Sequence, residues 1–269
     1  VPEGHVSHHN AIALGEALAG RTLTAVEVAH PRLLPQDLER RLAGDAFDRF
    51  AAAGKHHLIH FASGRVLHSH LRMSGSWRLC GPRGPARRAG LHLALMTATG
   101  GACLYRCPQV RLLDAHEPLP GPVRALGPDL LAPDVDPAAA ALRAVTHAPA
   151  GQEIGETLLD QRGVAGVGNA YKNESLFLAG ISPWRAAADV DAQEARELGA
   201  IAGRLLADGV RERGMIRTYA PGGSGVPGAK THWVHRRANR PCRRCGTAIR
   251  SRGQGDDNRT SYWCPTCQS

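Results

Sequence analysis

Two different spacings of apolar residues divide the chain. Between residues 22 and 113, apolar and polar positions alternate in short runs, which is typical of half-buried β-strands. The run 55–73 predicts two strands joined at residues 62–64, and the run 91–105 predicts a hairpin that turns at residues 99–101. These short antiparallel runs together predict a β-sandwich.

A helix is expected before the sandwich. Ile12, Leu14 and Leu18 recur at near-helical spacing, Ser7 can cap the N-terminus of this helix, and Gly20 can end it. We place the helix at the edge of the sandwich.

Beyond residue 125 the strands stop and the pattern becomes helical. Helical runs cover residues 137–145, 156–161, 169–180 and 191–214. The last run opens with a capping box formed by Asp191 and Glu194. We therefore expect an α+β chain with three domains. These are an N-terminal β-sandwich at 1–124, a helical domain at 125–235 and a cysteine-bearing tail at 236–269.

The composition indicates a soluble, basic protein. The chain has 269 residues, of which 43% are hydrophobic, yet no apolar run approaches the length of a membrane span. Polar residues and glycines interrupt the first thirty residues, so we expect no signal peptide, no membrane partner and a cytoplasmic protein. The 33 basic residues exceed the 24 acidic ones, which gives a net charge of +9 and favours a nucleic acid over an anionic membrane as partner.

The cysteines are the strongest chemical signal. Three of the seven, Cys80, Cys103 and Cys107, are scattered in strand-like sequence and are expected to be reduced thiols without a role. The other four form two Cys-x-x-Cys pairs with eighteen residues between them: Cys242, Cys245, Cys264 and Cys267. This spacing predicts one tetrahedral Zn²⁺ held by a ribbon, rather than two unrelated reduced pairs.

A zinc ion with four protein ligands has no open position for catalysis, so its role is structural. The sequence between the two cysteine pairs is long enough for a β-hairpin and carries Arg252 and Arg259. An arginine near a hairpin tip is suited to phosphate recognition.

A glycine-containing turn at residues 163–168 separates two helical runs, and the second run begins at Asn169. Such a turn can direct backbone N–H groups at a phosphate, although a plain helix–turn–helix packing motif fits equally well. A dinucleotide fingerprint is excluded because Tyr171 stands where the third glycine belongs and no strand precedes the turn. The stretch 223–228 likewise follows a helix rather than a strand, so it is expected to be a mobile loop and no nucleotide cofactor is expected.

The first residues, VPEGH, allow two interpretations. Pro2 suits the first turn of a helix, and Glu3 suits the positive end of its dipole. Alternatively, Val1 is a GTG start codon written literally. Removal of the initiator then exposes Pro2 as a free secondary amine.

These motifs resemble, over the whole length, the formamidopyrimidine-DNA glycosylase and endonuclease VIII (Fpg/Nei) family of base-excision repair enzymes. The stretches that carry the resemblance are PEGH, AGKHHLIHF, SHLRMSG, LGPDLL, LLDQRGVAGVGNAY and NRTSYWCPTCQ. The opening PEGH is similar to that of actinobacterial members. The resemblance implies a DNA glycosylase and AP lyase that acts on damaged DNA, works as a monomer and is associated with the nucleoid.

The resemblance also implies roles for individual residues. Pro2 is the nucleophile, Glu3 transfers a proton and Lys55 contacts a phosphate beside the lesion. The strand is then cleaved by β,δ-elimination. Asn169 and Arg259 match phosphate clamps of the family, and Met73 matches the wedge that fills the space left by a flipped base. Without the resemblance, Met73 would be taken for a core residue and Lys55 for a solvated one.

Two departures concern the substrate. Members that excise oxidised purines carry an arginine and a phenylalanine as further wedge residues, whereas the matching stretch YRCPQVRLL has Gln109, Arg111 and no phenylalanine. An acidic residue found three places after the family's glutamate is Val6 here. Both departures favour oxidised pyrimidines.

Two other functions remain open. The chain would be a non-catalytic binder of damaged or abasic DNA if Val1 is retained, because Pro2 would then be an amide. A zinc-ribbon accessory of transcription or of a topoisomerase would leave PEGH and Lys55 unexplained.

Overall fold

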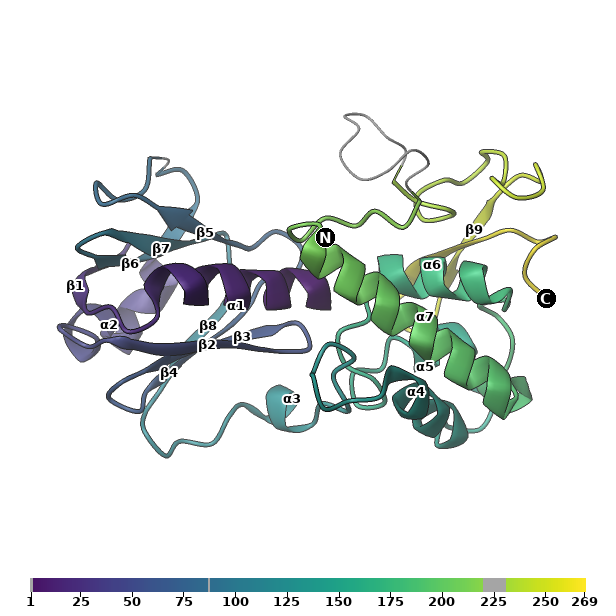
Figure 1. The fold of residues 1–269 in the computed structure, drawn as a ribbon, viewed down its shortest axis with the longest axis horizontal. Coiled ribbons are helices and arrows are strands. Elements are labelled where there is room, and N and C mark those ends of the chain that lie inside the picture. The colour runs from purple at the N-terminus through teal and green to yellow at the C-terminus, as the bar shows by residue number, and fades with distance from the viewer. Residues whose placement is uncertain (1, 87, 220–230) are drawn as a thin grey trace. The chain divides into compact units, whose positions relative to one another are not determined.

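The computed structural model describes residues 2–86, 88–219 and 231–269. The chain divides into two compact units, 1–124 and 125–269 (Figure 1). Val1 and the stretch 223–228, for which we expect a removable initiator and a mobile loop, lie outside the described residues. Among the described residues no helix has the length and apolar character needed to cross a membrane.

The first unit is a sandwich of two four-stranded antiparallel sheets, which confirms the predicted fold class. The first sheet has the order β1 (Leu23–Val28), β6 (Leu91–Thr97), β7 (Gly100–Tyr105) and β5 (Ser76–Cys80). The second has the order β2 (Phe47–Ala53), β3 (His56–Phe61), β4 (Val66–His70) and β8 (Gln109–Leu113). Short helices connect or follow these strands: η1 (Pro31–Gln36), α2 (Leu38–Arg41) and α3 (Gly121–Arg124).

The alternation of apolar residues explains the sandwich. Leu93 and Leu95 of β6 pack with Leu67 of β4 in the main core, while Ala94 between them belongs to a smaller cluster with Leu91. Ala94 points away from the main core because successive side chains of a strand point to opposite faces. The register of β6 shifts between Leu91 and Leu93, which places Leu91 in the same cluster as Ala94.

The turn of the second hairpin differs from the prediction. Strand β6 ends at Thr97 and β7 begins at Gly100, so both glycines that suggested a turn lie within a strand. A Cβ atom on Gly101 would lie 2.4 Å from the carbonyl oxygen of Leu95, and one on Gly100 would lie 2.6 Å from that of Cys80. Close approach of neighbouring strands therefore requires these glycines.

Helix α1 (Gly4–Leu18) begins earlier than predicted. Glu3 has extended backbone angles, φ −124° and ψ −172°, and the helix follows it directly. Ser7 is buried inside the helix, so the expected cap at Ser7 is wrong. Two polar residues of the first turns, His5 and Ser7, are buried, so the spacing of apolar residues alone does not show where the helix begins.

The second unit contains helices at three of the four predicted runs, followed by the zinc ribbon. Its elements are α4 (Pro137–Thr146), α5 (Ile154–Thr157), α6 (Asn169–Ala179), η2 (Ala187–Asp189), α7 (Ala192–Arg211), β9 (Arg250–Gln254) and β10 (Arg259–Trp263). The run 156–161 is helical only at its first two residues, because the helix there ends at Thr157. The capping box of Asp191 and Glu194 is present at the start of α7. Phe177 of α6 is buried with Val234, Ile249 and Cys264, so the ribbon packs on this helix through an apolar contact.

Candidate functional site

Pro2 and Glu3 lie immediately before α1, at its N-terminal end. Glu3 is almost fully buried, with 3% of its surface exposed. Asn10 Nδ2 lies 3.2 Å from His57 Nε2, and Gly15 packs against Phe50 further along the helix. Because Phe50 pairs with Ile59 in β3, α1 runs in the same direction as β3, and its N-terminus lies toward the end where β3 begins.

Lys55 and Met73 lie at that same end of the second sheet. Lys55 precedes β3, and His56 at the start of β3 pairs with His70 at the end of β4. Met73 follows β4 in the loop to β5, and 61% of its surface is exposed. Gln109 also pairs with His70, so the start of β8 joins this end. The first unit thus gathers Pro2, Glu3, Lys55 and Met73, the four residues that the sequence singled out there.

Four histidines underlie this end of the sheet, and the sequence analysis gave them no role. His56 Nδ1 lies 2.8 Å from His68 Nε2, and the rings of His56 and His70 are 4.6 Å apart. Burial and the neighbouring His70 lower the pKa of His56 and of His57 to about 3. Burial likewise lowers the pKa of His68 and of His70 to about 4. At neutral pH these rings are uncharged, so the positive charge beside them comes from Lys55 and Arg72 rather than from the histidines. Their clustering on adjacent strands in KHH and HSH was the available signal.

In the second unit, the turn 163–168 is held by a side chain whose role the sequence analysis also missed. Gln161 Oε1 accepts a hydrogen bond from the N–H of Gly166 at 3.2 Å, and its Nε2 donates to the carbonyl of Val167 at 3.0 Å. Gly166 has a φ of +99°, which a side chain would disfavour. The turn delivers Gly168 as the N-cap of α6 and Asn169 as its first residue, as predicted.

Side chains of α6 bind β10 of the zinc hairpin. Asn169 Nδ2 donates to the carbonyl oxygen of Thr260 at 2.8 Å, and Asn173 Oδ1 accepts from the N–H of Tyr262 at 3.2 Å. Between them, the fully buried Lys172 donates to the hydroxyl of Ser261. Arg259 is the first residue of β10, so these bonds bring Asn169 and Arg259 together although they are 90 positions apart (259 − 169) in the sequence.

Glu174 completes the attachment of α6 to the later part of the chain. Its buried carboxylate accepts hydrogen bonds from the N–H groups of Trp233, Val234 and His235 at 2.8 to 2.9 Å, and from the hydroxyl of Thr218. Several N–H donors compensate the burial of the charge. The signal available in the sequence was that Glu174 is the single acidic residue in the predicted helical run 169–180.

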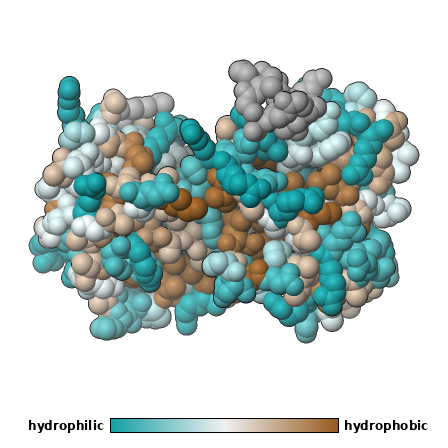
Figure 2. All heavy atoms as spheres, in the orientation of Figure 1, coloured by the Kyte–Doolittle hydropathy of each residue, from teal (hydrophilic) through white to brown (hydrophobic). Residues whose placement is uncertain are grey.

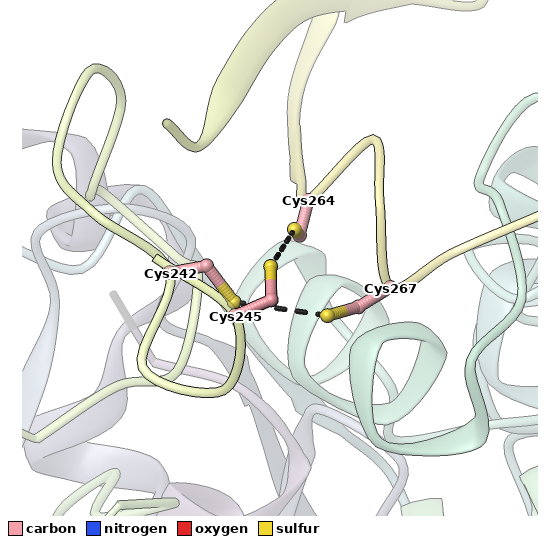
Figure 3. Close-up of side chains that lie close together, drawn as sticks. All are labelled: Cys242, Cys245, Cys264 and Cys267. Carbon is pink, nitrogen blue, oxygen red and sulfur yellow. Dashed lines mark hydrogen bonds between the residues drawn. The ribbon is translucent and has the colours of Figure 1, made fainter. Parts of the chain in front are cut away.

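The four predicted zinc ligands meet at the base of the hairpin (Figure 3). Their sulfur atoms all lie within 4.8 Å of one another. Cys242 Sγ is 3.9 Å from Cys267 Sγ, and Cys245 Sγ is 3.5 Å from Cys264 Sγ. Zn–S bonds of about 2.3 Å in a tetrahedron separate the sulfurs by about 3.8 Å, so these residues fit one structural zinc ion.

On the face in Figure 2, hydrophilic residues are interspersed with hydrophobic areas. On the hairpin, the guanidinium of Arg252 lies 3.7 Å from the ring centre of Trp184. Arg252, in the middle of β9, is therefore engaged in a cation–π contact. Arg259 lies next to the turn of the hairpin, and Asn169 at the start of α6 binds the residue after it, Thr260.

Three family descriptions match consecutive parts of the chain. The formamidopyrimidine-DNA glycosylase N-terminal domain matches residues 1–110, and the H2TH domain of the same enzymes matches residues 126–220. The zinc finger found in FPG and IleRS matches residues 240–269.

Individual relatives agree over the full length. "Probable endonuclease 8 2" of Streptomyces coelicolor is 40% identical over 100% of this chain and 94% of its own length. The "DNA-(apurinic or apyrimidinic site) lyase Nei2" of Mycolicibacterium smegmatis is 36% identical over 100% and 99%. A Lactococcus lactis FPG mutant solved with Fapy-dG-containing DNA has a TM-score of 0.81 at 26% identity, with both chains covered completely. The chain therefore belongs to the formamidopyrimidine-DNA glycosylase and endonuclease VIII family, whose members are DNA glycosylases and AP lyases.

Proposed function

We propose that this chain excises oxidised bases from DNA through the amine of Pro2 and then cleaves the strand. The observation that carries the proposal is the position of Pro2 and the buried Glu3 before α1, at the end of the sandwich where Lys55 and Met73 also lie. The proposal requires that the residue before Pro2 be removed, so that Pro2 is the terminal amine.

A terminal amine suits this chemistry because its reference pKa of about 7.7–8.0 leaves part of it neutral near pH 7. The nitrogen lone pair attacks C1′ of the flipped nucleotide, the bond to the base breaks with its electron pair on the base, and the departing base gains the proton that the Pro2 nitrogen loses. A proton from Glu3 to the sugar ring oxygen opens the ring, and the nitrogen and C1′ form an iminium. Loss of the acidified 2′ proton then expels the 3′ phosphate, and a second elimination expels the 5′ phosphate.

The other residues have binding roles in this proposal. Lys55, Asn169 and Arg259 contact phosphates, and Met73 fills the space that the flipped base leaves in the stack. The helical part, 125–235, and the zinc finger, 236–269, act as two DNA-binding domains. The protein works as a monomer without a nucleotide cofactor.

We further propose oxidised pyrimidines as the preferred substrate. Gln109 and Arg111 replace the additional wedge residues of purine-specific members. Endonuclease 8 proteins of actinobacteria are among the relatives, at 37 to 40% identity, and a Lactococcus lactis FPG has been solved with oxidised-pyrimidine DNA.

Borohydride trapping tests the nucleophile. The purified protein is incubated with abasic or oxidised-pyrimidine duplex and borohydride, which reduces the iminium to a stable adduct. Mass analysis of the untreated protein should identify Pro2 as the first residue. Peptide mapping of the adduct should identify Pro2 as the attachment point. Pro2→Gly should lose most base excision while it still binds DNA.

An adduct on Lys55, or on the amine of a retained Val1, would contradict the assignment of Pro2. DNA binding with neither an adduct nor strand cleavage would indicate a non-catalytic binder. Strand cleavage without a trappable adduct would indicate a mechanism that uses no amine nucleophile.

A further inference from the structure

Two cysteines that the sequence left without a role lie side by side in the first sheet. Cys80 is the last residue of β5, and Cys103 lies in the neighbouring strand β7. Their sulfur atoms are 2.9 Å apart. In the register of the two strands Cys80 pairs with Gly101 and Cys103 pairs with Arg78, so both side chains lie on the same face of the sheet.

This face is separate from the main core of the sandwich. Cys103 is fully buried in a small cluster with Leu91, Ala94 and Tyr105, and Cys80 lies at its border. The thioether sulfur of Met96 is 3.6 Å from Cys80 Sγ. The zinc ligands belong to the other unit of the chain, so this pair is independent of the metal site.

We propose that Cys80 and Cys103 form a reversible disulfide when the protein meets peroxide. The two sulfurs need to approach by less than 1 Å from 2.9 Å to reach the S–S bond length of about 2.05 Å. Strand β5 is at the edge of its sheet, and Cys80 precedes the connection to β6. The disulfide would therefore fasten the end of an edge strand to its only sheet neighbour, β7.

Access to solvent determines which sulfur reacts first. Cys80 is half-buried, whereas burial raises the pKa of Cys103 to about 12 and keeps it a thiol. The Cys80 thiolate attacks one oxygen of hydrogen peroxide, breaks the O–O bond and becomes a sulfenic acid as hydroxide leaves. Cys103 sulfur then attacks the Cys80 sulfur and displaces hydroxide, which takes the Cys103 proton as water. In total two thiols and one peroxide give one disulfide and two waters.

The test uses the full-length, zinc-loaded protein. It is treated with hydrogen peroxide, free thiols are alkylated, and peptides are mapped without reduction. We expect a peptide that joins Cys80 to Cys103, which a dithiol reverts to two alkylatable thiols. The oxidised protein should show a thermal midpoint higher by about 5 °C for the first unit, because the cross-link restricts the unfolded chain.

Three variants give the experiment its controls. Cys80→Ser and Cys103→Ala should each abolish both the cross-link and the shift in thermal midpoint. Cys107→Ser removes another buried thiol of the same unit and should leave both intact. If Cys80 instead proceeds to sulfinic acid while Cys103 remains alkylatable, or if Cys80 joins a zinc-binding cysteine, the proposal is wrong.

Discussion

Asn169 holds the carbonyl oxygen of Thr260 at 2.8 Å through one of its two Nδ2 hydrogens. The bond joins the first residue of α6 to the residue that follows Arg259, so the helix terminus and the hairpin arginine form one rigid group. In the proposed function both Asn169 and Arg259 contact the DNA phosphate backbone, and this bond would fix the spacing between them.

Removal of Arg259 should weaken DNA binding irrespective of sequence. We expect Arg259→Gln to lower affinity about tenfold and to reduce the slope of log affinity against log salt by about one, because one phosphate contact is lost. Arg250→Gln, at the zinc end of the same hairpin, is the matched control and should retain the slope. An unchanged slope for Arg259→Gln would mean that Arg259 does not contact phosphate.

Loss of the Glu3 carboxylate should separate the two steps of the reaction. Glu3→Gln should slow release of an oxidised base about 100-fold, since it removes a proton donor, and slow cleavage of a preformed abasic site less than about tenfold. Single-turnover assays on the two duplexes measure both rates. Glu16→Gln changes an exposed acid of the same helix and should affect neither. Equal losses in both assays would argue against proton transfer by Glu3.

Zinc should be required for the hairpin rather than for chemistry. We expect Cys264→Ser to lose its zinc and to bind DNA at least about tenfold more weakly, because the ribbon folds only around the metal. Metal analysis and DNA titration on the same sample measure both effects. Cys107→Ser lies outside the cluster and should keep one zinc per chain. A zinc-free sample that binds DNA normally would refute this role.

The buried histidines should make the first unit sensitive to acid. The pKa of His57 is about 3 in the folded protein and near 6.5 in the unfolded chain, so below pH 6.5 the unfolded chain binds more protons. The contribution of His57 to stability is therefore complete above pH 6.5 and is lost as the pH falls toward 3, by about 3 kcal/mol at pH 4.5. Urea unfolding between pH 7.5 and about 4.5 avoids most carboxylate titration, whose reference pKa values lie near 4.

In that series His57→Gln should reduce the dependence on pH, while His147→Gln, at an exposed position, should not. The same dependence in both variants would show that the acid sensitivity has another origin.

Local patterns predicted the parts of the structure that depend on neighbours in sequence. The alternation in HLIHF and VLHSH predicted β3 and β4, the Asp191–Glu194 pair predicted the start of α7, and the cysteine spacing predicted the zinc site. Each of these depends on contacts within one or two turns, or on a metal with fixed geometry.

Features that depend on distant contacts were missed or misplaced. Gly100 and Gly101 suggested a turn, but they allow β7 to approach β5 and β6 closely. That role becomes visible only when the strands are paired. Glu174 accepts hydrogen bonds from N–H groups some sixty positions away in the sequence. Cys80 contacts Cys103 on the neighbouring strand. No local propensity encodes such pairs.

The carboxylate of Glu174 has a consequence for how the chain can change in length. It binds Thr218 on one side and residues 233–235 on the other, and the N–H of Thr218 also donates to the carbonyl of Thr231 at 2.9 Å. Thr218, Thr231 and residues 233–235 are thus fixed to one another and, through Glu174, to α6. The zinc hairpin follows these residues in the chain, so the anchors at Glu174 and Phe177 set its place on α6, whatever the number of residues that separates Thr218 from Thr231.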